Sequence, residues 1–277
     1  MRYVELHLFR VKFIRPAQTL LLSDSRTSSE LFRDALLERP SAELRSGFLW
    51  HIGNVVQLDD SGGAFAIGRT TNTTLSRYDE EQGNFVEEDS EDSPYTVCLY
   101  DLQIGFVAIK KKTRLSPTTE GIARQLSKLL NQTEAAKSNE IQVRIDAIPD
   151  PFNFIARIQS ARFIKRFTAH FTGPNPFDAD ELFQKPLSVY CQAIQGETGK
   201  VITEGEALDS ETAIAVTRSV AATGNEASAR IIEHEGSRAR NIHLKGDNAK
   251  CTFPEDEFVP SDGLNAARSE YQKVRSA

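Results

Sequence analysis

The sequence predicts an α+β fold with two small mixed-sheet domains, in which helices pack on antiparallel sheets. Three observations predict this class. Runs of β-prone residues are interspersed with helical apolar patterns along 277 residues, a length that suits two domains of ordinary size. Turn-rich segments join neighbouring strands and favour hairpins. A polar stretch at 131–139, NQTEAAKSN, separates two such series and predicts the domain boundary.

The first predicted domain covers residues 1–131. Its hairpin is the clearest local signal, because FLWHIGNVVQL and GGAFAIGRT flank the turn residues Asp59 and Asp60. Its expected elements are a strand over 2–14, a helix over 28–37, strands over 48–58 and 64–70, a central strand over 95–110, and a helix over 118–130.

The second predicted domain covers residues 140–253 and begins with the alternating strand IQVRIDAI. We expect a polar tail over 254–277, with a loose helix near its end. The other expected elements are helices over 152–161, 179–195 and 212–222, strands over 163–171 and 201–204, and a final hairpin around Gly236 and Ser237.

An acidic insertion occupies residues 76–92. It holds eight acids and one arginine, a net charge of −7, whereas the whole chain has −6, so the remainder carries −6 − (−7) = +1. We expect a solvated loop or a long hairpin tip. Two roles stay open: a plain solvated insertion, or a phosphate mimic that covers a basic surface until nucleic acid displaces it.

Four cations follow the apolar run YTVCLYDLQIGFVAI and predict a phosphate-facing rim. Along a strand, Lys110 and Lys112 would share one face and Arg114 would extend it. The alternative is a sheet edge that lysines protect against aggregation. We expect no aromatic neighbour suited to base stacking there. The four cations are Lys110, Lys111, Lys112 and Arg114.

Two further basic clusters lie in the second predicted domain, and we expect them to extend a phosphate-binding track. The first contains Arg157, Arg162, Lys165 and Arg166, and the second contains Arg238, Arg240 and Lys245.

No local motif predicts catalysis, a cofactor or a metal site. Gly63 to Thr70 resembles a phosphate-binding loop, but Arg69 stands at the lysine position and the intervening residues are apolar, so a strand is favoured. Arg238 and His243 have the spacing of some helical ribonucleases, yet they lie on a predicted turn and strand. A metal-dependent nuclease with a dispersed site remains an alternative, although no Asp/Glu-x-Lys triplet occurs.

Residues 48–130 resemble the RexA-type phage-exclusion proteins. In both, two strands precede an apolar strand with an Ile-Gly-Phe element, here Ile104 to Phe106, then a Thr/Pro turn, here 116–119, and a helix. The acidic insertion departs from that pattern. The resemblance implies a bacterial or prophage anti-phage protein that binds DNA with little sequence preference, acts as a homodimer and signals to a protein effector. It implies no catalytic residues.

We therefore expect a non-catalytic protein that binds nucleic acid, namely duplex DNA, through the phosphate backbone. The charged N-terminus and the lack of a long apolar run predict neither a signal peptide nor a membrane span. Three scattered cysteines favour reduced thiols in the cytoplasm. The alternative function is a protein-interaction scaffold, with the acidic insertion as its docking element.

Overall fold

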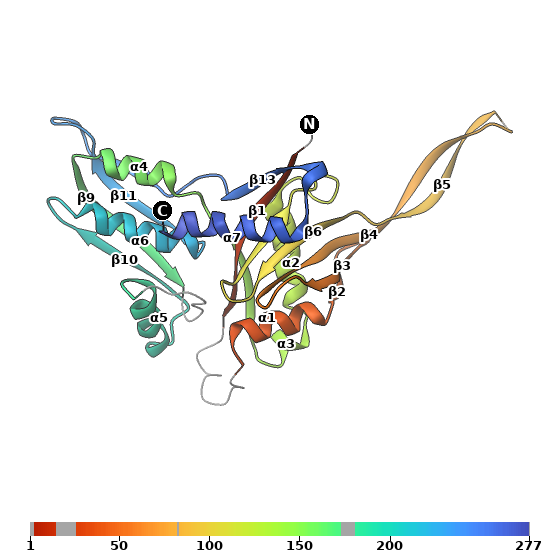
Figure 1. The fold of residues 1–277 in the computed structure, drawn as a ribbon, viewed down its shortest axis with the longest axis horizontal. Helices are drawn as coiled ribbons and strands as arrows, with labels where there is room; N and C mark the ends of the chain where they lie inside the picture. Colours follow the sequence, from red (N-terminus) through yellow and green to blue (C-terminus); the bar gives the residue numbers. More distant parts are fainter. Residues whose placement is uncertain (1–2, 15–25, 82, 173–180, 277) are drawn as a thin grey trace.

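A computed structural model describes residues 3–14, 26–81, 83–172 and 181–276. It confirms the α+β class, because two antiparallel sheets carry helices on their faces. Figure 1 shows the two sheets side by side and a long two-stranded arm that projects from the larger one.

The larger sheet has nine strands, all paired antiparallel. They are β1 (Tyr3–Ile14), β2 (Ser41–Arg45), β3 (Phe48–Gln57), β4 (Gly62–Asp79), β5 (Asn84–Asp92), β6 (Tyr95–Asp101), β7 (Phe106–Lys110), β8 (Gln142–Ala147) and β13 (Lys250–Pro254). The order is β13–β1–β7–β6–β4–β3–β2, with β8 joined to β1 and β5 joined to β4. The predicted hairpin over 48–70 is confirmed by the pairing of β3 with β4.

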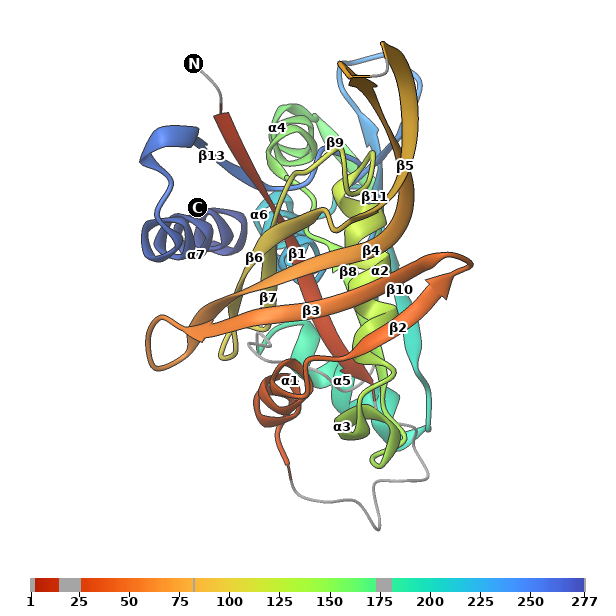
Figure 2. The same cartoon turned by 90° about the vertical axis from the view of Figure 1, so that its right-hand side faces the viewer.

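One face of this sheet is covered by α1 (Ser28–Leu37), α2 (Thr119–Leu130) and α3 (Glu134–Lys137). Thr27 caps α1 in a reciprocal pair with Glu30, which fixes where the helix begins. Residues of β1 point alternately to the two faces of the larger sheet, and each face has its own apolar core. Phe9 and Phe13 pack in the core beneath these helices, and Leu8 packs in the core on the opposite face. Figure 2 shows α2 on one side of the sheet and the C-terminal helix on the other.

The smaller sheet has four strands in the order β10–β9–β11–β12. Helices pack on it and continue the core that faces Leu8, so a single apolar cluster joins the two sheets. The elements are α4 (Phe152–Ser160), β9 (Phe163–Thr172), α5 (Gln184–Ala193), β10 (Thr198–Glu204), α6 (Ser210–Ala222), β11 (Ala227–Ile232) and β12 (Arg240–His243).

The C-terminal segment differs from the expected polar tail. After β13 and the short 3₁₀ helix η2 (Glu255–Glu257) comes α7 (Pro260–Ser276), whose Leu264, Tyr271 and Val274 are buried. Arg268 of α7 donates to the buried carboxylate of Asp101 at 2.6 Å and forks onto Asp59 in the β3–β4 turn. The apolar stripe of α7 was obscured by the many charged residues that lie between its buried positions in the sequence.

The predicted central strand over 95–110 is wrong as a single strand. It is the hairpin β6–β7, which turns at Gly105 with a φ of +74°, a conformation that glycine adopts without strain. β8, which lies within the range 140–253, pairs with β1 of the larger sheet.

The acidic insertion forms the outer part of a hairpin, one of the two forms that the sequence predicts. β4 leaves the body of the sheet near Thr71 and pairs with β5 from Thr71–Asp92 to Asp79–Asn84. We call residues 71–92 the acidic arm. Figures 1 and 2 show its strands extending away from the body and not folding back over it.

Candidate nucleic-acid interface

A surface cleft lies where the acidic arm meets the body of the larger sheet. Its volume is about 350 Å³. We call it the arm-base cleft. Its lining consists of the end of β5, the start of β6, and the chain that leaves β7: Asp92, Ser93, Pro94, Tyr95, Thr96, Val97, Lys110, Lys112 and Arg114.

The structure brings three of the four predicted cations to this cleft, although by a different route from the predicted one. β7 ends at Lys110, so the prediction of a continued strand is wrong beyond that residue. The chain turns instead, with the amides of Leu115 and Ser116 donating to the carbonyl of Lys112. This turn places Arg114 beside Lys110 and Lys112, where a straight strand would have carried it away.

The fourth cation, Lys111, lies elsewhere and is neutralised. Its amide donates to the carbonyl of Glu5, which extends the β1–β7 pairing, and its ammonium lies 3.3 Å from the Glu5 carboxylate. Lys250 also pairs with Glu5 at 3.2 Å. Lys250, together with Lys111, lowers the pKa of Glu5 to about 2. Lys111 therefore stabilises the sheet and adds little free charge to the cleft.

The cations of the cleft keep a net positive charge. Arg114 pairs with Asp92 at 2.8 Å, and Lys110 lies over the ring of Phe258, 5.2 Å from its centroid. Lys112 forms no ion pair with any other residue that the structure describes. Three cations and one carboxylate give the lining a formal charge of 3 − 1 = +2.

The expectation that no stacking aromatic lies near these cations is wrong. Tyr95, the first residue of β6, lines the same cleft and is 58% exposed. The sequence holds Tyr95 fifteen residues before Lys110, so only the β6–β7 hairpin brings the two together. The hairpin itself was missed, because its turn at Gly105 lies inside a continuous apolar run.

The second basic cluster lies on the smaller sheet, and each of its cations has its own carboxylate. Arg162 pairs with Glu235 at 2.6 Å, and Lys165 pairs with Glu206 at 2.7 Å. Arg166 pairs with Glu204, its register partner on β10. The side chains are exposed, and exposed pairs of this kind contribute roughly 0–1 kcal/mol. The predicted track therefore meets alternating charges here.

In the last predicted cluster, which contains Arg238, Arg240 and Lys245, one cation also lies near a glutamate. Arg240 lies 3.9 Å from Glu233, which is held more closely by Arg157 at 3.0 Å. Arg157 and, to a smaller extent, Arg240 lower the pKa of Glu233. Arg238 lies in the loop between β11 and β12 and forms no ion pair with the described residues.

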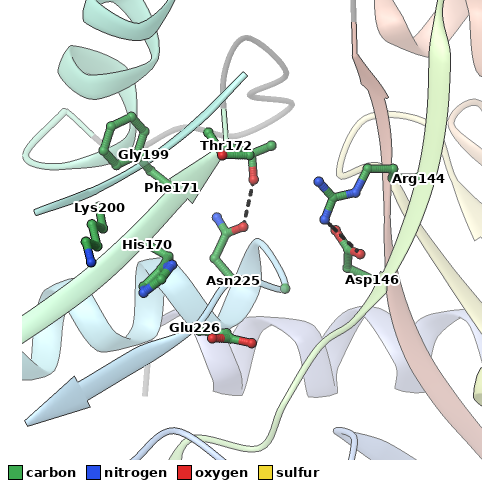
Figure 3. Close-up of a pocket in the computed structure, with 11 residues that line it drawn as sticks. Arg144, Asp146, His170, Phe171, Thr172, Gly199, Lys200, Asn225 and Glu226 are labelled. Atoms are coloured by element: carbon green, nitrogen blue, oxygen red, sulfur yellow. Dashed lines mark hydrogen bonds and ion pairs between the residues drawn. The ribbon is translucent and has the colours of Figure 1, made fainter. Parts of the chain in front are cut away.

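A second, larger cleft of about 510 Å³ lies at the seam between the two sheets. Figure 3 shows Arg144 and Asp146 of β8 on one side, His170 and Lys200 of the smaller sheet on the other, and Asn225 between them. Beside this cleft Lys12 of β1 is only 3% exposed. No motif predicted this cluster, although a lysine within a strand as apolar as β1 was its signal.

Lys12 is fully used by its neighbours. Its ammonium donates to Asp146 at 2.8 Å, to Asn225 at 2.9 Å and to Thr172 at 3.2 Å, which accounts for its three protons. Burial lowers the pKa of Lys12 from 10.5 to about 8, against the opposing effect of Asp146. Because Asp146 lies on the larger sheet, Thr172 ends β9 of the smaller one and Asn225 lies just before β11, Lys12 joins the two sheets. We interpret the seam cleft as structural.

The segment that resembles a phosphate-binding loop and the Arg238/His243 pair lie in the kinds of element that the sequence predicts for them. Gly63 to Thr70 lies within β4, as a strand. Arg238 and His243 lie on a loop and on β12, away from any helix. Within the described ranges no three His, Cys, Asp or Glu side chains gather to hold a metal ion, and no helix there is long and apolar enough to cross a membrane.

No protein-family model matches the chain, and no curated protein matches it. The functional argument therefore depends on the geometry of the arm-base cleft.

Proposed function

We propose that the protein binds nucleic acid through the phosphate backbone at the arm-base cleft. One observation supports this proposal above the others: Lys110, Lys112 and Arg114 line a single open cleft with a net charge of +2. Cations that contact phosphates release counterions, and this release supplies most of the affinity of sequence-independent binding.

The three cations have different roles in this proposal. Lys112 is free to contact a phosphate directly. Lys110 lies over the ring of Phe258 and supplies a positive charge to the lining of the cleft. Arg114 exchanges Asp92 for a phosphate, an exchange that costs little because the Arg114–Asp92 pair is exposed. Arg162, Lys165, Arg166, Arg238 and Arg240 contribute less, since most of them are already paired with glutamates.

The test is a triple variant, Lys110→Ala/Lys112→Ala/Arg114→Ala, titrated against a labelled oligonucleotide by fluorescence anisotropy at several salt concentrations. We expect the slope of log K against log[salt] to fall by about 2 to 3, and affinity at 0.1 M salt to fall about a hundredfold. The matched control, Arg162→Ala/Lys165→Ala/Arg166→Ala, removes the same charge and should change affinity less than threefold. Equal affinity of the wild type and the cleft variant would rule the proposal out.

We propose further that this binding serves an anti-phage system, with the protein as a regulatory homodimer that signals to an effector. The RexA-type resemblance over residues 48–130 motivates this role. Plaque counts on bacteria that carry either the wild type or the cleft variant check it: the variant should lose protection. Equal protection by both would separate any defence role from nucleic-acid binding.

A second candidate function is a protein-interaction scaffold in which the acidic arm is the docking element. Two observations favour it. The arm projects from the body, and its tip carries Tyr78 and Phe85, which contact each other at 5.2 Å between ring centroids while remaining 53% and 80% exposed. Exposed aromatic pairs of this kind are typical of protein interfaces.

Replacing residues 72–91 by Asn-Gly separates the two functions, because Thr71 and Asp92 face each other in register and a two-residue turn can close them. If the arm joins copies of the chain, light scattering should show that the molar mass falls to that of one shortened chain, which is below the 30.9 kDa of the full chain, with nucleic-acid affinity maintained. An unchanged molar mass would exclude the arm as the contact between copies.

A further inference from the structure

We infer that the arm-base cleft takes single-stranded nucleic acid, with one base stacked on the ring of Tyr95. This inference rests on the proposed function and changes its expected ligand from duplex to single strand. Its basis is the placement of an exposed tyrosine among three cations, the combination that sequence-independent single-strand binders use.

The sheet register places Tyr95 next to the cations. β6 and β7 pair Cys98 with Ile109, the last pair before β7 ends at Lys110, so Val97 and Lys110 follow next to each other. Alternate residues of a strand share one face, so Tyr95 and Val97 point to the same side of β6, and Lys112 reaches the cleft from the turn that follows β7. All four residues line the cleft, which agrees with that register.

On the other side of β6 lies β4, whose residue opposite Tyr95 has no side chain. Its register partner on β4 is Gly68, where an added Cβ would lie 2.8 Å from the Cβ of Tyr95 and 2.9 Å from the carbonyl of Pro94. A side chain at position 68 would therefore displace Tyr95. Tyr95 keeps its place over Gly68 and remains 58% exposed, so its ring is accessible from solvent.

The size of the cleft and the exposure of Tyr95 favour a single strand over a duplex. A volume of about 350 Å³ is at the lower end of small-ligand pockets, roughly 300–1,000 Å³, and suits a nucleotide unit. Paired bases in a duplex are stacked on each other and cannot stack on a side chain without being flipped out.

Two tyrosine variants and two ligands test the inference. The variants are Tyr95→Ala and Tyr95→Phe, and the ligands are a thymidine 12-mer and a 12-mer of the same backbone without bases. We expect wild type to bind the thymidine strand roughly 5- to 150-fold more tightly than the abasic strand, the range that base–aromatic stacking supports. Tyr95→Ala should lose this preference, and Tyr95→Phe should keep it.

A 12-base-pair duplex completes the experiment. Tyr95→Ala should change duplex affinity less than twofold, because phosphate contacts alone hold the duplex, and thermal unfolding confirms that the variant is folded. The inference is overturned if Tyr95→Ala binds both single strands as the wild type does, or if it weakens duplex and single strand equally. In either case the proposed function still stands if Lys110→Ala/Lys112→Ala/Arg114→Ala weakens all ligands, and it fails if that variant weakens none.

Discussion

The two basic regions of this protein carry the same number of cations and differ in where their carboxylates lie. On the smaller sheet, Arg166 faces Glu204 in register on the neighbouring strand, and Arg162 and Lys165 have glutamate partners of their own. At the arm-base cleft, the chain has left the sheet beyond Lys110, so no strand faces Lys112. Only Arg114 is paired there.

A basic run in a sequence therefore forms a positively charged surface only where the fold places no carboxylate beside its cations. Cross-strand neighbours in an antiparallel sheet are about 5 Å apart, so a glutamate at the right register neutralises an arginine on the next strand. A turn at the end of a strand has no such neighbour. Arg166 and Lys112 show the difference: Arg166 faces a glutamate within the sheet, and Lys112 lies beyond the end of β7 without such a neighbour.

Lys12 is a buried cation whose charge is fully paired, because its ammonium donates to three acceptors and is shielded from water. We expect Lys12→Met to lower the free energy of unfolding at pH 7 by roughly 1–3 kcal/mol, because the part-buried oxygens of Asn225 and Thr172 lose a donor while Arg144 still pairs with Asp146. Urea denaturation at pH 7 measures it. The control is Lys200→Met, which lies in the neighbouring seam cleft on the surface and should change stability by less than about 0.5 kcal/mol.

The same variant has a pH signature. The pKa of Lys12 is about 8 in the folded protein and 10.5 in the unfolded chain, so between these values the unfolded chain binds more protons. Stability from this group therefore rises as pH increases from 8 to 10.5, by up to roughly 3 kcal/mol. The gap between wild type and Lys12→Met should widen from pH 7 to pH 10. A gap that stays constant would show that Lys12 titrates as an exposed lysine does.

Removing the glutamates of the smaller sheet should turn its paired cations into an anion-binding surface. In Glu204→Gln/Glu206→Gln/Glu235→Gln, the charges of Arg162, Lys165 and Arg166 are no longer offset. We expect about a tenfold gain in affinity for a labelled oligonucleotide at 0.1 M salt, with a steeper salt dependence. No gain would mean that the geometry of this surface, beyond its charge, excludes nucleic acid.

The equivalent change at the arm-base cleft should have the smallest effect. Asp92→Asn releases Arg114 only, and the Arg114–Asp92 pair is exposed, so we expect a two- to threefold gain measured in the same assay. A gain as large as that of the triple glutamine variant would show that Asp92 blocks the cleft. In that case the cations of the arm-base cleft would be the ones that a carboxylate keeps from binding nucleic acid.

Much of the fold could be predicted from local signals. Three features depend on residues only a few positions apart in the sequence: the turn at Asp59, the cap of α1 and the apolar stripe of α2. The final hairpin, β11–β12, was predicted for the same reason. The hairpin β6–β7 was missed because a buried strand and a buried turn look alike in a continuous apolar run.

The candidate site could be predicted only in part. The three cations of the cleft lie within five residues, so the sequence shows them directly. Tyr95 depends on the register of β6 with β7, and the cluster at Lys12 depends on partners more than 130 residues away. The glutamates that neutralise the smaller sheet were not anticipated either, because pairings across strands cannot be inferred from spacing along one strand.

The pairing of β1 with β13 has a consequence for folding. The first half of β1 hydrogen-bonds to residues 250–254 along one edge, while the second half pairs with β8. During synthesis, the edge from Tyr3 to His7 stays open until nearly the whole chain has left the ribosome. Contacts of such long sequence separation slow folding, and an unpaired edge strand invites aggregation meanwhile, so this protein should depend on chaperones more than its size suggests.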